Sequence, residues 1–234
     1  MKDFRFKQFT IHQDHAAMKV GTDADLLGTM AEGGADILDI GTGTGVLSLM
    51  MAQRFPDAQV TAIDIDDNAI IDAKQNISES PFASRITLHH ASLQDFIKEH
   101  SEPAFDSIIC NPPYFDKSLE CGKNESRTRA RHTSSLPFSV LVGGAYCLLK
   151  DGGVFSVCLP PEVIDDFHAE CIIKGFSLKV NNKVKSVPEK GPKRYILVYQ
   201  KQHVSIPEEH TYCMRDADRA VSQWYKDLLK DFLL

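Results

Sequence analysis

The stretch Asp36-Ile37-Leu38-Asp39-Ile40-Gly41-Thr42-Gly43-Thr44-Gly45 decides the fold class. Its first half, residues 36–40, is short and largely apolar, which is typical of a buried parallel strand. Glycines and threonines then alternate, and a glycine loop between a strand and a helix lets the backbone approach a bound ligand closely. Residues 46–55 follow with the amphipathic pattern of a helix. The stretch therefore predicts the opening unit of a ligand-binding α/β sheet.

The remaining sequence continues this alternation of strands and helices. Further strands are predicted at 59–65, 85–90, 105–110 and 154–159, and helices at 68–78, 93–100, 136–150, 161–174 and 218–234. Two strands of more alternating pattern, 177–187 and 194–200, are expected to form an antiparallel pair. The order predicts an α/β fold with a mainly parallel sheet and helices on both faces.

Composition limits the class of protein. With 234 residues, 43% hydrophobic and 25% charged, the chain is expected to form one domain, 1–234, with an N-terminal capping segment, 1–35, and a core, 36–234. The capping segment is expected to hold a helix capped by Thr22 or Asp23. Apolar runs are too short to span a membrane, and the first residues lack the apolar stretch of a signal peptide. We therefore expect a cytoplasmic protein with no membrane association and no obligate protein partner.

The residues around the glycine loop bear on its ligand. The loop alone fits NAD as well as S-adenosylmethionine (SAM), but its third glycine comes one residue too early for a pyrophosphate fingerprint. Asp39 precedes the first glycine, where a carboxylate is unfavourable beside a pyrophosphate and suits an amino-acid cofactor with an ammonium group. We interpret Asp39, Gly41, Thr42 and Gly43 as cofactor-binding residues for a neutral or cationic ligand.

Two further strand ends add candidates. Asp64 ends the second strand, roughly 20 residues beyond the glycine loop, where a carboxylate can accept hydrogen bonds from both ribose hydroxyls. Ile65 follows it. After the third strand, SAM-binding proteins often place an acid to receive the adenine amino group, and here Ser92 and Leu93 occupy that place. Asp66 is expected to cap the next helix.

The strand 105–110 ends abruptly in Asn111-Pro112-Pro113-Tyr114. Two prolines cannot continue a strand, so this rigid loop lies at the carboxyl edge of the sheet, where ligands bind. The Asn111 oxygen and the Pro112 carbonyl can accept hydrogen bonds from both N–H groups of a conjugated amine, which aims its lone pair at an electrophile. A tyrosine at this place can stack on the planar target, worth about 1–3 kcal/mol for a nucleobase. Adenine N6, cytosine N4, guanine N2 and a glutamine amide all fit.

The chain resembles a known family at three segments. These are Lys7-Gln8-Phe9 with residues 17–23, then residues 38–45, and Asn111-Pro112-Pro113-Tyr114-Phe115 with residues 129–132. The resemblance is to class I SAM-dependent amino-methyltransferases, and among them to the bacterial tRNA(Val) adenine-N6 methyltransferases that modify the adenine 3′ of the anticodon. It implies a seven-stranded Rossmann-like sheet, SAM as methyl donor, tRNA as substrate, and Lys19 and Thr22 near the methionine end of SAM.

Charge gives a candidate surface for RNA. The formal net charge of −6 argues against an all-over basic nucleic-acid binder, but not against a local patch. Arg127, Arg129 and Arg131 alternate after the proline loop, so in an extended segment they would face phosphates on one side. His12 and His15 have no further ligand at metal spacing, and no metal site is predicted.

The favoured prediction is thus methylation of adenine N6 in tRNA, with the anticodon arm as binding partner. One alternative is N-methylation of a protein glutamine amide, which the tetrapeptide would serve equally well. Only about 35 residues precede the first strand, which is short for a separate recognition domain. The other alternative is a non-catalytic module that binds SAM and docks to RNA.

Overall fold

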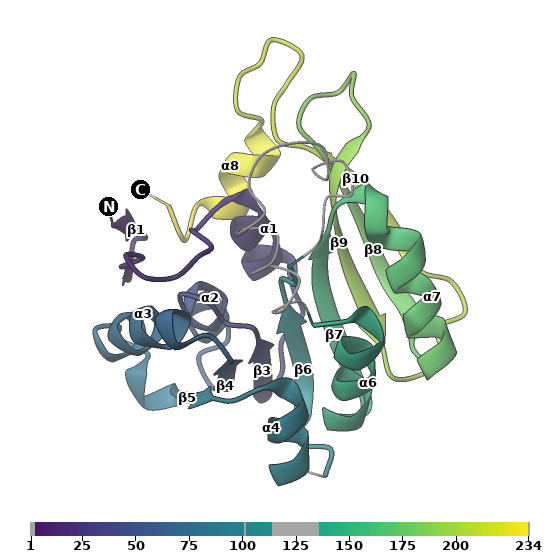
Figure 1. Cartoon of the computed structure of the whole chain (residues 1–234). Helices are drawn as coiled ribbons and strands as arrows, with labels where there is room; N and C mark the ends of the chain where they lie inside the picture. Colours follow the sequence, from purple (N-terminus) through teal and green to yellow (C-terminus); the bar gives the residue numbers. More distant parts are fainter. Residues whose placement is uncertain (1–2, 101, 114–135, 234) are drawn as a thin grey trace, which may run out of the picture.

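The computed structural model describes residues 3–100, 102–113 and 136–233 (Figure 1). The main sheet contains β3 (Asp36–Ile40), β4 (Gln59–Asp64), β5 (Ile86–His90), β6 (Phe105–Cys110), β7 (Leu149–Leu159), β8 (Ser177–Lys185), β9 (Pro192–Gln200) and β10 (Glu208–Cys213). The helices are α1 (Thr22–Met30), α2 (Val46–Arg54), α3 (Asp67–Ser78), α4 (Leu93–Glu99), α6 (Phe138–Leu148), α7 (Ile164–Lys174) and α8 (Gln223–Leu229). Before them, β1 (Phe4–Arg5) and β2 (Thr10–Ile11) form a small antiparallel pair.

The main sheet has the strand order β10-β8-β9-β7-β6-β3-β4-β5. All neighbouring strands pair in parallel except at β9, which is antiparallel to β7 and β8. The mainly parallel sheet with an antiparallel strand near the C-terminus is confirmed. The chain runs outward from β3 to β5 and then returns to β6 on the other side of β3, and such a reversal opens a crevice at the carboxyl edge.

The predicted number of seven strands is wrong, because the described residues form eight in this sheet. The additional strand, β10, pairs in parallel with β8 along its whole length. Its first four residues, 208–211, are all exposed. A strand without a buried face has no period-two hydrophobic pattern, so sequence reading cannot find it.

Helices cover both faces of the sheet and divide the core in two. One cluster joins α1, α2 and α3 to one face and includes Leu26, Met50 and Val60. The other joins α4, α6 and α7 to the opposite face and includes Phe96, Phe155 and Phe167. Both clusters extend to strands at the centre of the sheet, so the two faces of β3 and β6 are buried and their ends are held rigidly.

Several element ends differ from the predictions. Gly21, and neither Thr22 nor Asp23, is the N-cap of α1, and no side chain caps this helix. The last helix is shorter than predicted: α8 starts after Ser222, whose hydroxyl accepts a hydrogen bond from the Tyr225 N–H. The stretch before it forms a turn closed by the Asp216 N–H on the Ala220 carbonyl at 2.9 Å. Ser222 is thus the N-cap of α8, and the helix begins after it rather than at residue 218.

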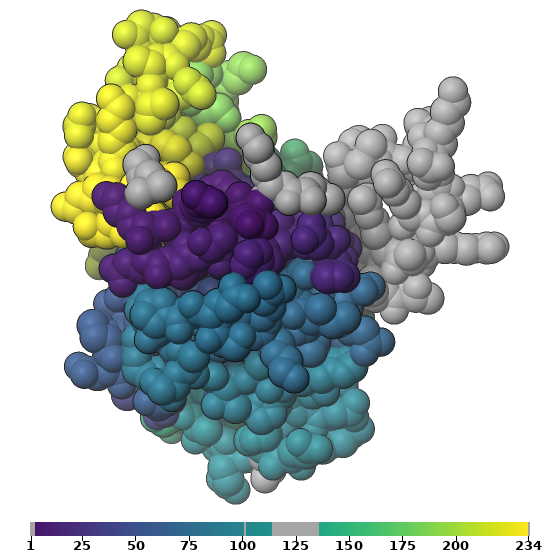
Figure 2. Space-filling view, turned by 90° about the vertical axis from the view of Figure 1, so that its left-hand side faces the viewer, coloured from purple at the N-terminus to yellow at the C-terminus, as the bar shows by residue number. Residues whose placement is uncertain are grey.

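The N-terminal residues lie across one side of the molecule. They form a band between the region of α3 and the C-terminal segment (Figure 2). The Lys7 N–H donates to the Phe232 carbonyl at 2.7 Å, which joins the two ends of the chain. None of the described helices is both long and apolar enough to cross a membrane.

Candidate active site

The predicted site residues come together at one edge of the sheet. Since β3, β4, β5 and β6 are parallel, the residues that follow them share the carboxyl edge. The glycine loop follows β3, Asp64 ends β4, Ser92 follows β5, and Asn111 follows β6. The glycine loop and Asn111 are therefore on neighbouring strands, at the point where the strand order reverses.

The glycine loop is held open by bonds to β4. The N–H groups of Gly41 and Thr42 donate to the Ile63 carbonyl at 2.9 and 3.0 Å. Gly41 and Gly43 have φ angles of 71° and 58°, which are left-handed conformations that favour glycine. A Cβ atom on either residue would meet none of the described residues within 4 Å, its own chain neighbours aside. The backbone at these two glycines therefore faces open space in which a ligand can approach it.

Asp64 lies directly beside this space. One of its carboxylate oxygens accepts the Gly43 N–H at 2.8 Å, and the other accepts the Asp66 N–H at 2.9 Å. Each oxygen keeps a further lone pair, so the half-buried carboxylate can still accept hydrogen bonds from a diol. These two bonds fix its orientation. Asp66 itself is the N-cap of α3, as predicted.

Asp39 is completely buried under the loop. Its Oδ2 accepts hydrogen bonds from the Thr42 hydroxyl at 2.6 Å, the Ser48 hydroxyl at 2.7 Å and the Ser48 N–H at 3.1 Å. Its Oδ1 is also buried and has no partner among the described residues. Burial raises the pKa of Asp39 to about 6, although the bonds from Thr42 and Ser48 oppose the shift. The free oxygen suits a cationic donor, whereas the Thr42 hydroxyl is used inside the protein.

Asn111 has a second such buried oxygen, without a hydrogen-bond partner among the described residues, which like that of Asp39 we call an orphan oxygen. Its side-chain Oδ1 is buried and has no hydrogen-bond partner within the described ranges. Unpaired buried acceptors are rare in folded proteins and are costly unless a ligand supplies the donor. Pro112 is buried and Pro113 is exposed, so the turn leaves the sheet at Pro113. The strand end thus presents an amide oxygen and a constrained carbonyl at the edge of the sheet.

The remaining cofactor candidates, Ile65, Leu93 and Ser92, differ in exposure and polarity. Ile65 is 63% exposed although it is a large apolar residue, and it follows Asp64 directly. Leu93 is buried. The Ser92 hydroxyl caps α4 by accepting the Asp95 N–H at 3.1 Å and donates to the Asp95 carboxylate at 2.7 Å. Ser92 therefore keeps one acceptor position for an amine, while Asp95 belongs to the first turn of α4.

The two N-terminal candidates, Lys19 and Thr22, have partners within the protein. The Lys19 ammonium donates to the backbone carbonyls of Gln13 and Ala16. Thr22 is the first residue of α1, and its side chain faces the Tyr225 hydroxyl, whose pKa burial raises to about 12 while Thr22 opposes the shift. Tyr114, Arg127, Arg129 and Arg131 lie outside the described residues.

Two cavities of the described residues lie elsewhere. One, of about 720 Å³, lies between the N-terminal segment, α2 and α8 and is lined by Lys7, Arg54 and Phe232 among others. The other, of about 370 Å³, lies at the opposite edge of the sheet and is lined by Glu32, Lys150 and Lys179 among others. Neither includes a predicted site residue, so the orphan acceptors and the open glycine loop define the candidate site.

The donors and acceptors at the carboxyl edge fit the predicted cofactor. The open glycine backbone, the orphan oxygen of Asp39, the oriented Asp64 carboxylate and the exposed Ile65 match the parts of an amino acid joined to a nucleoside. Sequence reading missed two residues next to this set, Asp72 and Asn76, which are buried on α3. The sequence could have indicated them, because two polar residues one turn apart lie on the helix face that carries the apolar residues of α3.

Comparisons with known proteins bear on the fold and the family. Residues 15–125 match the family model of the methyltransferase small domain. A solved structure of a predicted O-methyltransferase from Agrobacterium tumefaciens superposes with a TM-score of 0.70 at 20% identity, covering 90% of this chain and 96% of that one. At this identity the likeness shows a common fold.

Curated relatives show the family. A tRNA1(Val) (adenine(37)-N6)-methyltransferase from Phocaeicola vulgatus is 44% identical over 199 residues, covering 84% of this chain and 83% of the relative. The enzyme of the same name from Pseudoalteromonas translucida is 39% identical and covers 100% of this chain and 99% of the relative. Both relatives have the same name, and the similarity extends over 84% and 100% of this chain. The chain therefore belongs to the family of tRNA1(Val) (adenine(37)-N6)-methyltransferases.

Proposed function

We propose that this protein transfers a methyl group from SAM to the exocyclic N6 of an adenine in tRNA. The substrate we favour is the adenine next to the anticodon of tRNA(Val), bound through the anticodon arm. The observation that carries the proposal is the buried Asn111 oxygen, which has no partner among the described residues and directly follows β6, the strand next to β3 and its glycine loop. Relatives named for the same reaction support it. We infer from a tRNA substrate that the protein acts in the cytoplasm, and that residues 1–234 act as one methyltransferase domain.

The cofactor would be held by the edge described above. When bound, SAM would supply the methyl group from its sulfonium, whose C–S bond breaks as the N–C bond forms, so that a neutral thioether leaves. The Asp39 oxygen can accept from its ammonium, Asp64 from its ribose, and Ile65 can cover a face of its adenine. Gly41 and Gly43 allow the close approach of the backbone.

Asn111 and Pro112 orient the target amine. The adenine N6 is a poor nucleophile because its lone pair is delocalised into the ring. When the Asn111 oxygen and the Pro112 carbonyl accept from both N–H bonds, the nitrogen is drawn towards tetrahedral geometry and its lone pair is aimed along one direction. A base in duplex or stacked RNA must first be flipped out to reach this position. The methylated nitrogen then loses a proton to solvent, so no strong base is required.

The test uses labelled SAM and two substrates. The protein is incubated with unmodified bulk tRNA or with a peptide-release factor, and the labelled nucleoside or residue is identified. We expect label in tRNA as N6-methyladenosine. Label that appears only in protein would refute the RNA assignment and favour glutamine methylation, and binding of SAM and tRNA without turnover would favour the non-catalytic alternative.

A further inference from the structure

Residues 12–20 form a segment that we call the strap, which connects β2 to α1. It lies along α3 and belongs to the N-terminal band of Figure 2. Two polar residues of α3 hold it, Asp72 and Asn76, and each is only 1% exposed. Residues four positions apart share one face of a helix. On this face Ala69, Ala73 and Ile77 are also buried, so two hydrogen-bonding side chains stand in an otherwise apolar contact.

Asn76 joins the strap to the glycine loop. Its Oδ1 accepts the His12 N–H at 2.7 Å, and its Nδ2 donates to the His12 carbonyl and to the Thr44 carbonyl, both at 2.8 Å. Thr44 belongs to the glycine loop. One buried side chain therefore bonds to both segments. Its loss would remove a buried bond to Thr44 and two part-buried bonds to His12.

Asp72 holds the strap one turn closer to the start of α3. Its Oδ2 accepts the N–H groups of His15 at 3.0 Å and of Ala16 at 2.7 Å, and its Oδ1 contacts the His15 Nδ1 at 2.7 Å. Burial opposes ionisation of Asp72, but these bonds outweigh it and lower the pKa of the carboxyl. The contacts are charge-assisted and therefore stronger than neutral ones.

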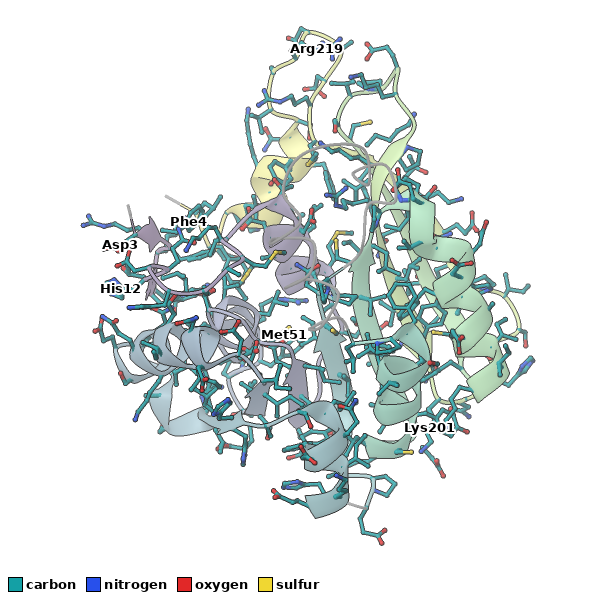
Figure 3. The ribbon with its side chains drawn as sticks, in the orientation of Figure 1. Asp3, Phe4, His12, Met51, Lys201 and Arg219 are labelled. Carbon is teal, nitrogen blue, oxygen red and sulfur yellow. The ribbon has the colours of Figure 1, made fainter. Side chains whose placement is uncertain are left out.

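The direction of the strap follows from these contacts. It passes from Asn76 to Asp72, and so towards the amino end of α3, which begins just after Asp64. Near His12 the strap is also held by ion pairs of the His12 ring with Asp3 at 3.1 Å (Figure 3) and with Glu79 at 3.0 Å.

The far part of the strap turns towards the other half of the sheet. The Val20 N–H donates to the Gln13 side chain at 2.9 Å, and the Lys19 ammonium binds the Ala16 carbonyl at 2.8 Å. The chain then enters α1, which packs on β7 and β9. The strap is therefore anchored on α3 at one end and, through α1, on β7 and β9 at the other. In the sheet order β3 lies between these supports, and Asn76 bonds both to His12 of the strap and to Thr44 of the glycine loop, so the strap lies beside this loop.

We propose that Asp72 and Asn76 are positioning residues for the cofactor, which fix the strap and the glycine loop as two walls of one pocket. When a segment of the pocket must become ordered on binding, the cost of ordering it reduces the affinity for the ligand. A segment that is already ordered carries no such cost. Because the two side chains bond to the backbone of both segments, they keep the pocket formed before the ligand arrives. The inference rests on the SAM-dependent function proposed above, and it concerns cofactor binding only.

The test compares Asp72→Asn with a matched control, Asp106→Asn. Asp106 likewise accepts two consecutive N–H groups on one oxygen, those of Ala35 at 3.1 Å and Asp36 at 2.9 Å, and it likewise has a basic partner, Lys150. Its contacts lie at the start of β3, at the edge of the sheet opposite the glycine loop. Each protein is titrated with SAM by calorimetry, and its melting temperature is measured without ligand.

We expect both variants to lose thermal stability, and only Asp72→Asn to lose affinity for SAM, by about ten-fold. The milder His15→Ala keeps the backbone bonds, removes only a half-exposed ring, and should raise the Kd about three-fold. Without ligand, the strap amides should exchange faster in Asp72→Asn than in the wild type and in Asp106→Asn, and the slowing caused by saturating SAM should be larger in Asp72→Asn.

Equal SAM affinity in Asp72→Asn and Asp106→Asn, with SAM-dependent protection of the strap unchanged, would overturn the positioning role. Should Asp72→Asn fail to fold, an unchanged Kd and unchanged protection in His15→Ala would overturn it as well. Failure of the wild type to bind SAM would instead refute the proposed function, so the two failures are distinguishable.

Discussion

A methyl group added at Gly43 tests whether the open space before the glycine loop is the cofactor site. Gly43 has a φ of 58° and its N–H is bonded to Asp64, while a Cβ there would meet nothing within 4 Å. Gly43→Ala therefore clashes with no atom of the described residues. Its effect on the free protein is limited to the left-handed conformation, which costs an L-residue about 1–2 kcal/mol. In a chain of this length that corresponds to a melting temperature lower by about 2–8 °C.

Gly152 offers a matched control. Its φ is 77°, and a Cβ there would lie 3.5 Å from the Gln202 side chain, an ordinary contact. It lies at the start of β7, at the opposite edge of the sheet. Gly152→Ala should therefore lower the melting temperature by a similar amount. Only Gly43→Ala places a methyl group where the ligand approaches, and we expect its Kd for SAM to rise at least ten-fold, or about 1.4 kcal/mol.

The assay is calorimetric titration of both variants with SAM, together with thermal unfolding without ligand. Equal SAM affinity of Gly43→Ala, Gly152→Ala and the wild type would refute the placement of the cofactor against the loop. Equal melting temperatures of Gly43→Ala and the wild type would refute the conformational part of the reasoning.

Further predictions concern turnover, pH and RNA. Asn111→Ala should abolish methylation, because the amine loses its acceptor, while SAM affinity by calorimetry stays within about two-fold; surviving activity would contradict the orienting role. Burial, with a smaller effect of Asp23, raises the pKa of Asp25 to about 6. Its contribution to stability is therefore complete below its ordinary pKa of 3.8 and is lost as the pH rises through 6. Asp25→Asn should raise the free energy of unfolding in urea at pH 7.5 by up to about 3 kcal/mol and add little at pH 4; an equal gain at both would exclude this cause. The double variant Arg129→Ala with Arg131→Ala should weaken tRNA binding and make its salt dependence shallower, as measured by filter binding; unchanged binding would leave these arginines without a role in RNA contact.

Local patterns were sufficient for most of the fold. Strands such as 105–110 and 154–159 are apolar runs bounded by polar turns, and their alternation with helices predicts a mainly parallel sheet before any contact is known. Hydrophobic sequence patterns did not predict an element that has no buried face of its own. β10 is exposed at its first four residues and exists because the edge of β8 offers backbone groups to pair with. The predicted N-cap of α1 was also wrong. Gly21 caps this helix without a side-chain hydrogen bond, so the sequence has no capping side chain at the true start.

The candidate site divides in the same way. The sequence by itself determined the chemistry of the carboxyl edge, because Gly41, Gly43, Asp64 and Asn111 follow directly on strands whose ends must share one edge in a parallel sheet. Only the tertiary structure decided which polar atoms remain available there. The Thr42 hydroxyl turns inward to Asp39, whereas Oδ1 of Asp39 and Oδ1 of Asn111 have no partner among the described residues. Only the tertiary structure also decided that Asp72 and Asn76 bind backbone groups more than 30 residues distant along the chain. Hydrogen bonds between segments so far apart depend on packing, which no local pattern records.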